Sequence, residues 1–261
     1  MWLIIGLGNP GSQYARNRHN VGFRLAETLA DANGFQPERQ KYQGLLREGK
    51  IGNQKCLILR PQTFYNDSGK SVGAAQKFFK IPVENVIVLH DELDLAPGKV
   101  RVKIGGSAAG NNGLRSIMGQ IGDGFTRVRI GIGHPGHKSA VTGHVLGNFT
   151  QDDLTDWVED LDRAFVAGFA HLFADDKDGN AKFMSTIAQA LVPQRAGPTT
   201  APGNLPPPKL AKKSPTKPDK ADPIADKAEA NPDTAIQHKK SDKKSGNAFT
   251  EALRGLLNKK D

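Results

Sequence analysis

Cysteine and long apolar runs are what this sequence has least of. Its 261 residues include a single cysteine, Cys56, which excludes an intramolecular disulfide and fits a reducing cytoplasm. The longest apolar runs span four or five residues, whereas a membrane-spanning helix needs about 20. A charged segment followed by an apolar one is also absent near the start. We therefore expect a cytoplasmic protein with neither a signal peptide nor a membrane anchor.

Large apolar residues are likewise scarce from position 194 to position 248. The segment 194–261 carries nine of the 16 prolines, 14 Lys or Arg and eight Asp or Glu, a net charge of +6. Such a composition buries too little apolar surface to offset the entropy of ordering, which predicts a disordered basic tail. A helical pattern at about 248–260 is a candidate site for an unidentified partner. Residues 1–193 then form the folded domain, whose net charge is only +3, so a polyanion site on it must be local.

The sequence gives no signal for a nucleophilic side chain or a metal. A Gly-x-Ser-x-Gly turn is absent, and Cys56 lies inside a strand-like run, so we interpret it as a core residue. His134 and His137 are separated by Pro-Gly, which predicts a turn, and no further ligand follows at metal spacing. We therefore expect no metal site and no cofactor.

What the sequence does contain is an alternation of short apolar runs with helical patterns. The apolar runs predict strands near 2–5, 86–89, 100–104 and 127–132, and a hairpin over 44–59. The helical patterns predict helices near 21–32, 68–79, 151–173 and 181–191, and a short one from Asn112. The alternation predicts one α/β domain with a mixed, mostly parallel sheet.

A glycine-rich turn, Gly6-x-Gly8-x-x-Gly11, follows the first apolar run. The spacing is that of a dinucleotide-binding turn. However, Pro10 disfavours helical backbone at the residue before it, and the next helical pattern begins only near Val21. The acidic residue expected about 20 positions further on is missing as well. These departures disfavour a dinucleotide enzyme, which stays a third alternative.

Polar side chains follow several of the predicted strands and could meet in one crevice. His19 follows the first strand, Asn66 the strand that ends near Leu59, and Asp91 the strand from Val86. A histidine oriented by a carboxylate can act as a general base on water, which makes His19 and Asp91 a candidate pair. The alternative is a histidine with a structural partner only.

Asparagines and cations supply further candidates. Amide groups can donate hydrogen bonds to a developing oxyanion or read a peptide or ribose, and the alternative is a role in turns. The asparagines suited to this are Asn9, Asn66 and Asn112. Basic residues alternate along two strands, so each pair lies on one face, as phosphate contacts or as a solvated surface. They are Arg101 with Lys103 and Arg127 with Arg129.

Six motifs occur in order over residues 2–191. They are Gly6-Leu7-Gly8-Asn9-Pro10-Gly11 with Tyr14, Arg18-His19-Asn20-Val21-Gly22, Thr63-Phe64-Tyr65-Asn66-Asp67-Ser68-Gly69, His90-Asp91-Glu92-Leu93-Asp94, Asn112-Gly113-Leu114 and Arg127-Val128-Arg129-Ile130-Gly131-Ile132-Gly133. In this series the chain closely resembles the bacterial-type peptidyl-tRNA hydrolases. The resemblance implies a monomeric, single-domain α/β sandwich with helices flanking a central mixed sheet. It also implies hydrolysis of the ester between a peptide and the 3′ ribose of tRNA, which recycles prematurely released peptidyl-tRNA.

The resemblance also implies a role for each matching residue. His19 would activate water, Asp91 would hold it in its basic form, and Asn9 would distinguish blocked from free amino groups. Four residues would contact the peptide and the 3′ end of the tRNA, namely Tyr14, Phe64, Asn66 and Asn112. Lys103 and Arg129 match a pair that clamps the 5′ phosphate.

The chain departs from the resemblance at a few positions. Family members commonly have Gly, His and Met where this chain has Ala109, Asn111 and Tyr65. Asn111 replaces a ring that could titrate or stack, so a minor role at the rim of the site is in doubt. The alternative function is a non-catalytic tRNA-binding or nucleotide-binding protein, which would tolerate the loss of His19.

Overall fold

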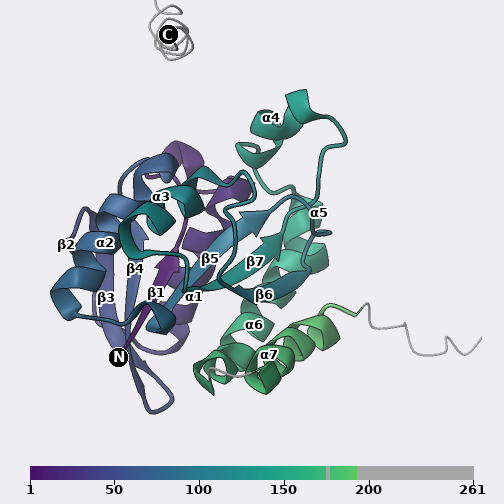
Figure 1. The fold of residues 1–261 in the computed structure, drawn as a ribbon. Coiled ribbons are helices and arrows are strands. Elements are labelled where there is room, and N and C mark those ends of the chain that lie inside the picture. The colour runs from purple at the N-terminus through teal and green to yellow at the C-terminus, as the bar shows by residue number, and fades with distance from the viewer. Residues whose placement is uncertain (175–176, 193–261) are drawn as a thin grey trace, which may run out of the picture. The chain divides into compact units, whose positions relative to one another are not determined.

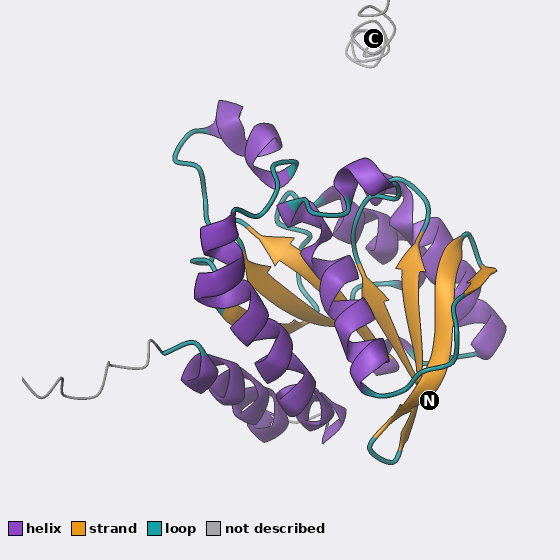
Figure 2. Cartoon of the chain, turned by 180° about the vertical axis from the view of Figure 1, so that it is seen from behind, coloured by secondary structure: helices purple, strands orange, loops and turns teal. Residues whose placement is uncertain are grey.

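A seven-stranded sheet forms the centre of the described domain and carries helices on both faces (Figures 1 and 2). The computed structural model describes residues 1–174 and 177–192. The strands are β1 (Trp2–Gly6), β2 (Arg39–Lys41), β3 (Gly44–Ile51), β4 (Gln54–Pro61), β5 (Val86–Glu92), β6 (Val100–Ile104) and β7 (Thr126–Gly131). They lie in the order β2-β3-β4-β1-β5-β7-β6. The four central strands β4, β1, β5 and β7 pair in parallel, and the outer pairs are antiparallel, which confirms the mixed sheet.

The described helices cover the sheet from both sides. They are α1 (Val21–Ala32), α2 (Ser68–Phe79), α3 (Asn112–Ile121), α4 (Val141–Val145), α5 (Gln151–Asp153), α6 (Glu159–Gly168) and α7 (Lys177–Ala190). Residues of α1, α6 and α7 share an apolar cluster with one face of the sheet. Those of α2 and α3 share a second cluster with the other face. The chain therefore buries both faces of its central strands, as parallel strands require.

Strand β1 shows why the first apolar run is continuous rather than alternating. Trp2 and Ile4 belong to the cluster under α1, whereas Leu3 and Ile5 belong to the cluster under α2, and all four are buried. Successive side chains of a strand point to opposite faces, so a strand covered on both sides is apolar at every position.

The predicted elements agree closely with the observed ones. The first two long helices begin and end where the sequence places them, and the hairpin of β3 and β4 turns at Gly52. Cys56 is buried in the core, as predicted. Helix α7 begins at Lys177, before the predicted residue 181. The sequence patterns do not predict the short elements β2 and α4.

Some predictions fall where the structure gives no description. The tail over 194–261, with its short helix at 248–260, lies outside the described residues. The domain boundary at residue 193 therefore stays a prediction. Among the described helices, none is long and apolar enough to cross a membrane.

Helix α1 approaches the central strands so closely that it needs glycine at its second position. A Cβ on Gly22 would overlap the carbonyl oxygen of Leu89 and the backbone of Leu7. The same closeness lets the Phe23 amide donate to the Leu7 carbonyl at 3.1 Å, and the Leu7 amide to the Leu89 carbonyl at 2.9 Å. These contacts lock the start of α1 to the ends of β1 and β5.

Gly22→Ala is expected to lower the free energy of unfolding by about 2–3 kcal/mol, because backbone atoms of two strands would have to move. Urea unfolding measures the change. Gly119→Ala is the matched control, since Gly119 is also helical and a Cβ there would have nothing within 4 Å. Alanine at this position should stabilise the helix by up to about 1 kcal/mol. Equal effects at the two positions would contradict the close contact.

Candidate active site

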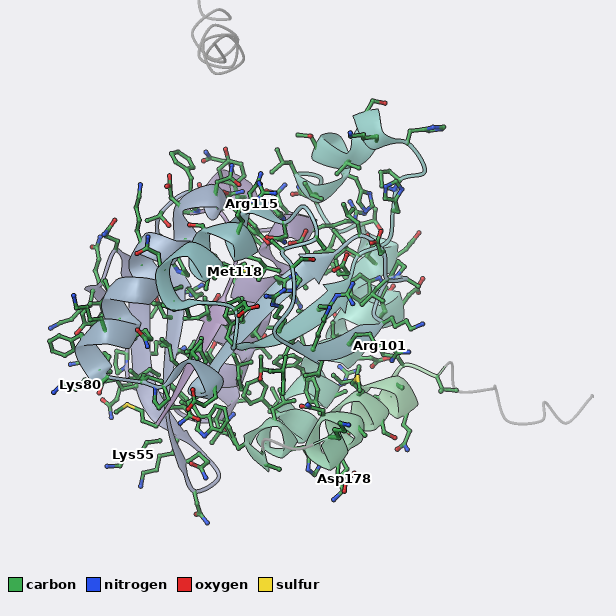
Figure 3. The ribbon with its side chains drawn as sticks, viewed as in Figure 1. Lys55, Lys80, Arg101, Arg115, Met118 and Asp178 are labelled. Atoms are coloured by element: carbon green, nitrogen blue, oxygen red, sulfur yellow. The ribbon has the colours of Figure 1, made fainter. Side chains whose placement is uncertain are left out.

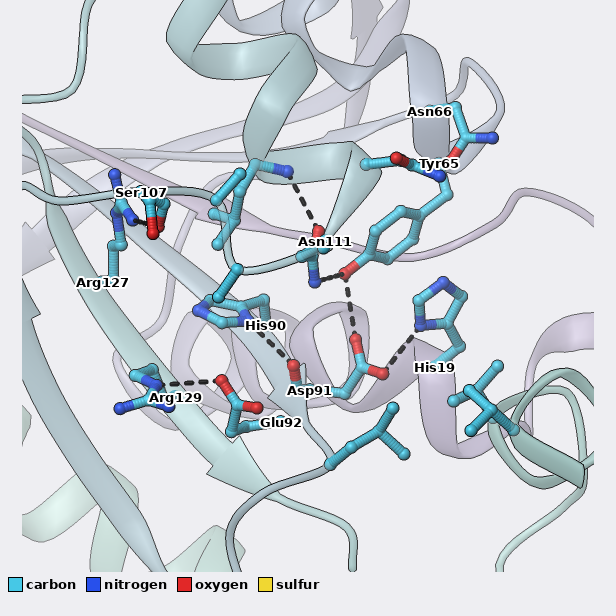
Figure 4. A pocket seen from close by; sticks show the side chains of 18 of the residues that line it. His19, Tyr65, Asn66, His90, Asp91, Glu92, Ser107, Asn111, Arg127 and Arg129 are labelled. Carbon is cyan, nitrogen blue, oxygen red and sulfur yellow. Dashed lines mark hydrogen bonds and ion pairs between the residues drawn. The ribbon is translucent and has the colours of Figure 1, made fainter. Parts of the chain in front are cut away.

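A hydrogen bond between His19 and Asp91 lies at the centre of the site (Figure 4). The ring Nδ1 of His19 is 2.8 Å from Oδ2 of Asp91. The Asp91 side chain is only 4% exposed, and that of His19 is 18% exposed. A side chain so little exposed needs hydrogen-bond partners within the protein for its polar atoms. The pair predicted from the sequence is therefore in contact.

The fold explains how two residues so far apart in sequence meet. His19 lies in the short 3₁₀ turn η2 (Arg18–Asn20), directly before α1, and Asp91 lies near the end of β5. Because Gly22 locks the start of α1 to Leu7 and Leu89, the turn before the helix lies over the end of β5. This is the edge of an open α/β sheet where ligands usually bind.

Asn9 is held in one orientation by three hydrogen bonds. Its backbone amide donates to Oδ1 of Asn20, and Nδ2 of Asn20 donates to its carbonyl, both at 2.9 Å. Its side-chain Oδ1 accepts from the backbone amide of Tyr65 at 3.0 Å. The Asn9 NH2 group therefore has no partner among the described residues and is available to donate to a substrate.

Tyr65 and Asn111 extend the central pair. The Tyr65 hydroxyl donates to Oδ1 of Asp91 at 2.9 Å and accepts from Nδ2 of Asn111 at 3.0 Å. Burial, together with the nearby charge of Asp91, raises the pKa of Tyr65 well above its usual value, so the phenol keeps its proton. Asn111 thus lies inside the hydrogen-bond network of the site rather than at its rim.

A cavity of about 340 Å³ opens above the pair and is lined by residues from β5, β6, β7 and the start of α3. His19, Asp91, Asn66 and Asn112 line it, together with the cations Lys103, Arg127 and Arg129. One cavity therefore joins the candidate base to the candidate phosphate contacts. Asn9 lines a neighbouring cavity of about 550 Å³ along α1.

The register of β6 and β7 decides what each cation can do. Lys103 lies opposite Arg127, and Arg101 lies opposite Arg129, so all four basic residues share one face. Arg127 is buried and donates to the carbonyl oxygens of Gly106 and Ser107, and burial lowers its pKa. Arg127 therefore supports the 105–110 loop, a role that its spacing in the sequence does not indicate.

Arg129 is already engaged by a carboxylate. Its Nε donates to Oε2 of Glu92 at 2.9 Å, and both side chains are partly buried. Lys103, in contrast, is exposed. Arg101 on β6 and Arg115 on α3, both labelled in Figure 3, add further exposed positive charge on this side of the molecule.

The remaining predicted residues differ in whether they reach the cavity. Phe64 is 70% exposed, and Asn66 next to the Tyr65 turn is also exposed. Oδ1 of Asn112 accepts from Arg115 at 2.9 Å, so the NH2 group of Asn112 points away from Arg115. Tyr14 is half-buried in its own turn and lines neither of the two cavities. The structure thus brings Asn66 and Asn112 to the cavity but not Tyr14.

His90 is a buried histidine with a structural partner. Its Nδ1 donates to the carbonyl of Asp91 at 2.8 Å, and burial lowers its pKa, so the ring is neutral. His90 cannot take part in proton transfer with Asp91 because it contacts the backbone and not the carboxylate. His90 therefore has the purely structural role that is the alternative for His19.

The segment after β7 is tied to the turn that carries His19. Arg18 donates to Asp153 at 2.7 Å, and its backbone amide donates to the Gly147 carbonyl at 2.9 Å. Asn17 and Asn148 form an isolated β-bridge. These contacts hold residues 146–153 against η2.

A histidine oriented by a buried carboxylate, beside a free amide donor and a group of cations, is typical of a hydrolase that acts on a polyanionic ester. A more specific assignment follows from similarity. The peptidyl-tRNA hydrolase family model matches residues 3–192. The chain is 52% identical over 206 residues to a peptidyl-tRNA hydrolase of Ruegeria pomeroyi, covering 79% of this chain and 84% of that protein.

A second relative and a solved structure agree. A peptidyl-tRNA hydrolase of Novosphingobium aromaticivorans is 54% identical over 188 residues, covering 72% of this chain and 96% of that protein. The crystal structure of peptidyl-tRNA hydrolase from Acinetobacter baumannii has 40% sequence identity and a TM-score of 0.63, covering 72% of this chain and 94% of that one. The chain belongs to the peptidyl-tRNA hydrolase family.

Asp153 offers a test of how the segment after β7 is held. Burial alone would raise the pKa of Asp153, but hydrogen bonds from Thr150, Trp157 and Arg18 outweigh it and lower the pKa below its usual value. Since the pKa is lower in the folded state, the carboxylate stabilises the protein above the unfolded pKa of about 4, and this contribution is lost as pH falls through the folded pKa.

Asp153→Asn is therefore expected to lower the free energy of unfolding at pH 7 by about 1–2 kcal/mol, with the difference from the wild type vanishing in acid. Urea unfolding at several pH values measures it. Asp152→Asn is the control, because Asp152 is exposed on the same turn and has no arginine partner among the described contacts. A difference that persists unchanged at pH 3 would show that the carboxylate charge is not responsible.

Proposed function

We propose that the chain, an ester hydrolase of the peptidyl-tRNA hydrolase family, cleaves the bond between a peptide and the 3′ ribose of tRNA with His19 as general base. The observation that carries the role of His19 is its hydrogen bond to the buried carboxylate of Asp91, inside a cavity that also contains cations. A non-catalytic tRNA-binding protein would need the cations but not this pair.

The hydrogen bond sets the direction of proton transfer. Asp91 accepts from Nδ1 of His19, so the ring proton lies on Nδ1 and the lone pair of Nε2 is free. Nε2 then takes a proton from water while the water oxygen attacks the ester carbonyl. The same proton passes to the 3′ oxygen of the ribose as the C–O bond breaks, which leaves a carboxylic acid and a tRNA hydroxyl.

Amide donors supply the charge stabilisation. The NH2 group of Asn9 is free because its oxygen accepts from Tyr65, and the NH2 group of Asn112 is directed away from Arg115. Such groups can donate to the oxyanion of the tetrahedral intermediate or to the peptide carbonyl. We propose that Asn9 recognises the blocked amino group and that Asn66 contacts the peptide and the 3′ end. Phe64 and Tyr14, which line neither cavity, would contact the substrate outside them.

The cations account for binding of the nucleic acid. Lys103 is exposed at the mouth of the cavity, and Arg129 lies diagonally from it on the neighbouring strand. We propose that they bind the 5′ phosphate of tRNA, which replaces Glu92 as the partner of Arg129. We further propose that the protein acts in the cytoplasm as a monomer, without a membrane or a cofactor, and that a further partner binds the 194–261 segment.

Replacing the candidate base tests the mechanism. His19→Ala should lower kcat on N-acetyl-aminoacyl-tRNA by about 100-fold or more, and Asp91→Ala somewhat less, the usual scale of general base catalysis. The wild-type rate should fall in acid, because a protonated ring cannot accept a proton. Release of the ester-linked amino acid is measured, with free aminoacyl-tRNA as the poor substrate. Near-normal kcat in His19→Ala would favour the non-catalytic alternative.

Replacing the cations separates binding from chemistry. Lys103→Ala and Arg129→Ala should raise KM on full-length tRNA with kcat unchanged, because the contact serves ground and transition states equally. Each should also reduce the slope of log K against log salt by about 0.7–0.9. A short substrate with only the 3′ end should be insensitive to both.

Lys41→Ala is the control for the cations, since Lys41 is an exposed lysine on β2, at the opposite edge of the sheet from β6. It removes the same charge without touching the cavity. If Lys103→Ala and Arg129→Ala impair the short substrate as much as full-length tRNA, the two residues belong to the fold or to the catalytic site and do not clamp a phosphate.

A further inference from the structure

Asp91 has two carboxylate oxygens, and His19 uses only one of them. Oδ2 is bonded to Nδ1 of His19 at 2.8 Å, and Oδ1 accepts from the Tyr65 hydroxyl at 2.9 Å. A buried carboxylate with a single partner would be free to rotate about its Cβ–Cγ bond. The phenol removes that freedom.

The Tyr65 hydroxyl is in turn fixed by Asn111. Oδ1 of Asn111 caps α3 by accepting from the Leu114 amide at 3.0 Å, so its NH2 group must point away from the helix. That group donates to the Tyr65 oxygen at 3.0 Å. Because the oxygen accepts there, its own hydrogen points to Asp91. Every donor in the chain of hydrogen bonds from α3 to Asp91 therefore points toward the carboxylate (Figure 4).

The ring of Tyr65 makes a second contact with the candidate base. The His19 and Tyr65 rings are stacked, with centroids 3.7 Å apart and an angle of 14° between their planes. The backbone of Gly113 lies against one edge of the Tyr65 ring, so a Cβ at residue 113 would overlap that ring. Tyr65 is thus packed between α3 and His19, and it has one orientation.

We propose that Tyr65, held by Asn111, is a positioning residue that fixes both Asp91 and the ring of His19 and sets the pH at which the base becomes active. This rests on the proposed role of His19 as general base. The phenol touches the carboxylate and not the reacting atoms, so its effect is exerted through Asp91.

The electrostatic effect has a definite sign. A donor on Oδ1 draws negative charge away from the bond to His19 and so weakens the attraction between the carboxylate and a protonated ring. Without the hydroxyl, the carboxylate should hold the protonated ring more strongly. His19 would then stay protonated, and inactive as a base, to a higher pH.

Other titratable groups near His19 cannot produce the same change. Those on the elements packed against it are Arg18 of η2, Arg24, Glu27 and Asp31 of α1, Tyr65 and Asp67 of η3 (Tyr65–Asp67), His90, Asp91 and Glu92 of β5, and His144 of α4. Apart from Asp91 and Tyr65, each has a bond to some other group. These partners are the same in the wild type and in the variants below.

Tyr65→Phe keeps the ring, its stacking and its burial, and removes only the hydroxyl. We expect kcat on N-acetyl-aminoacyl-tRNA to fall about tenfold with KM unchanged, the scale of one hydrogen bond to a charged group. The acid limb of the kcat–pH profile should move to higher pH by about half a unit or more. Protein NMR of the His19 ring should show the same displacement of its protonation without substrate.

Asn111→Ser tests the outer part of the chain. Serine can still cap α3 but cannot reach the phenol, so the hydroxyl loses its orienting donor. The same changes as in Tyr65→Phe are expected, but smaller. In the double variant Asn111→Ser should add nothing to Tyr65→Phe, because Asn111 acts only through the hydroxyl. Tyr42→Phe is the control, since Tyr42 packs against Phe78 and Phe79 at the far edge of the sheet.

The outcomes separate this inference from the proposed function. If His19→Ala is inactive while Tyr65→Phe keeps the wild-type kcat and acid limb, the positioning role is wrong and the general base stands. A Tyr65→Phe variant that only melts earlier, with no displacement of the acid limb or of the NMR titration, also overturns it. If His19→Ala keeps its activity, the base assignment itself fails.

Discussion

The contact of α1 with the ends of β1 and β5 is the constraint on which the site depends. Gly22 leaves room for the carbonyl of Leu89, and backbone hydrogen bonds then join Leu7 to both the strand and the helix. Because the turn η2 precedes α1 without a break, the position of His19 follows from this contact. A side chain at residue 22 would push the start of α1, and with it the turn that carries His19, away from these strand ends.

The sequence predicted the parts of the molecule that depend on local patterns. Continuous apolar runs located the strands, because both faces of the sheet are covered. Helical periodicity located the start of α1 at Val21. The ends of parallel strands pointed to His19 and Asp91, because such ends meet at one edge of a sheet. The comparison with known relatives then confirmed the family to which the motifs pointed.

The rest depends on tertiary contacts that no local pattern contains. The sequence marked Tyr65 only as a departure from the family's usual Met, because its bond to Asp91 forms only when η3 lies over β5. Glu92 had no assigned role because its bond to Arg129 requires the parallel pairing of β5 with β7. That Lys103 lies opposite Arg127 likewise follows from a strand register that spacing alone does not fix.

The hydrogen bonds of the site join parts of the chain that are distant in sequence. His19 and Asp91 are separated by 72 residues, Asn9 and Tyr65 by 56, and Tyr65 and Asn111 by 46. The entropy of closing these loops must be offset before any of the bonds can form, which requires that β1, β4 and β5 already be paired. During refolding, activity therefore returns only after global folding. A partly folded chain has no hydrolase activity, rather than a reduced rate of hydrolysis.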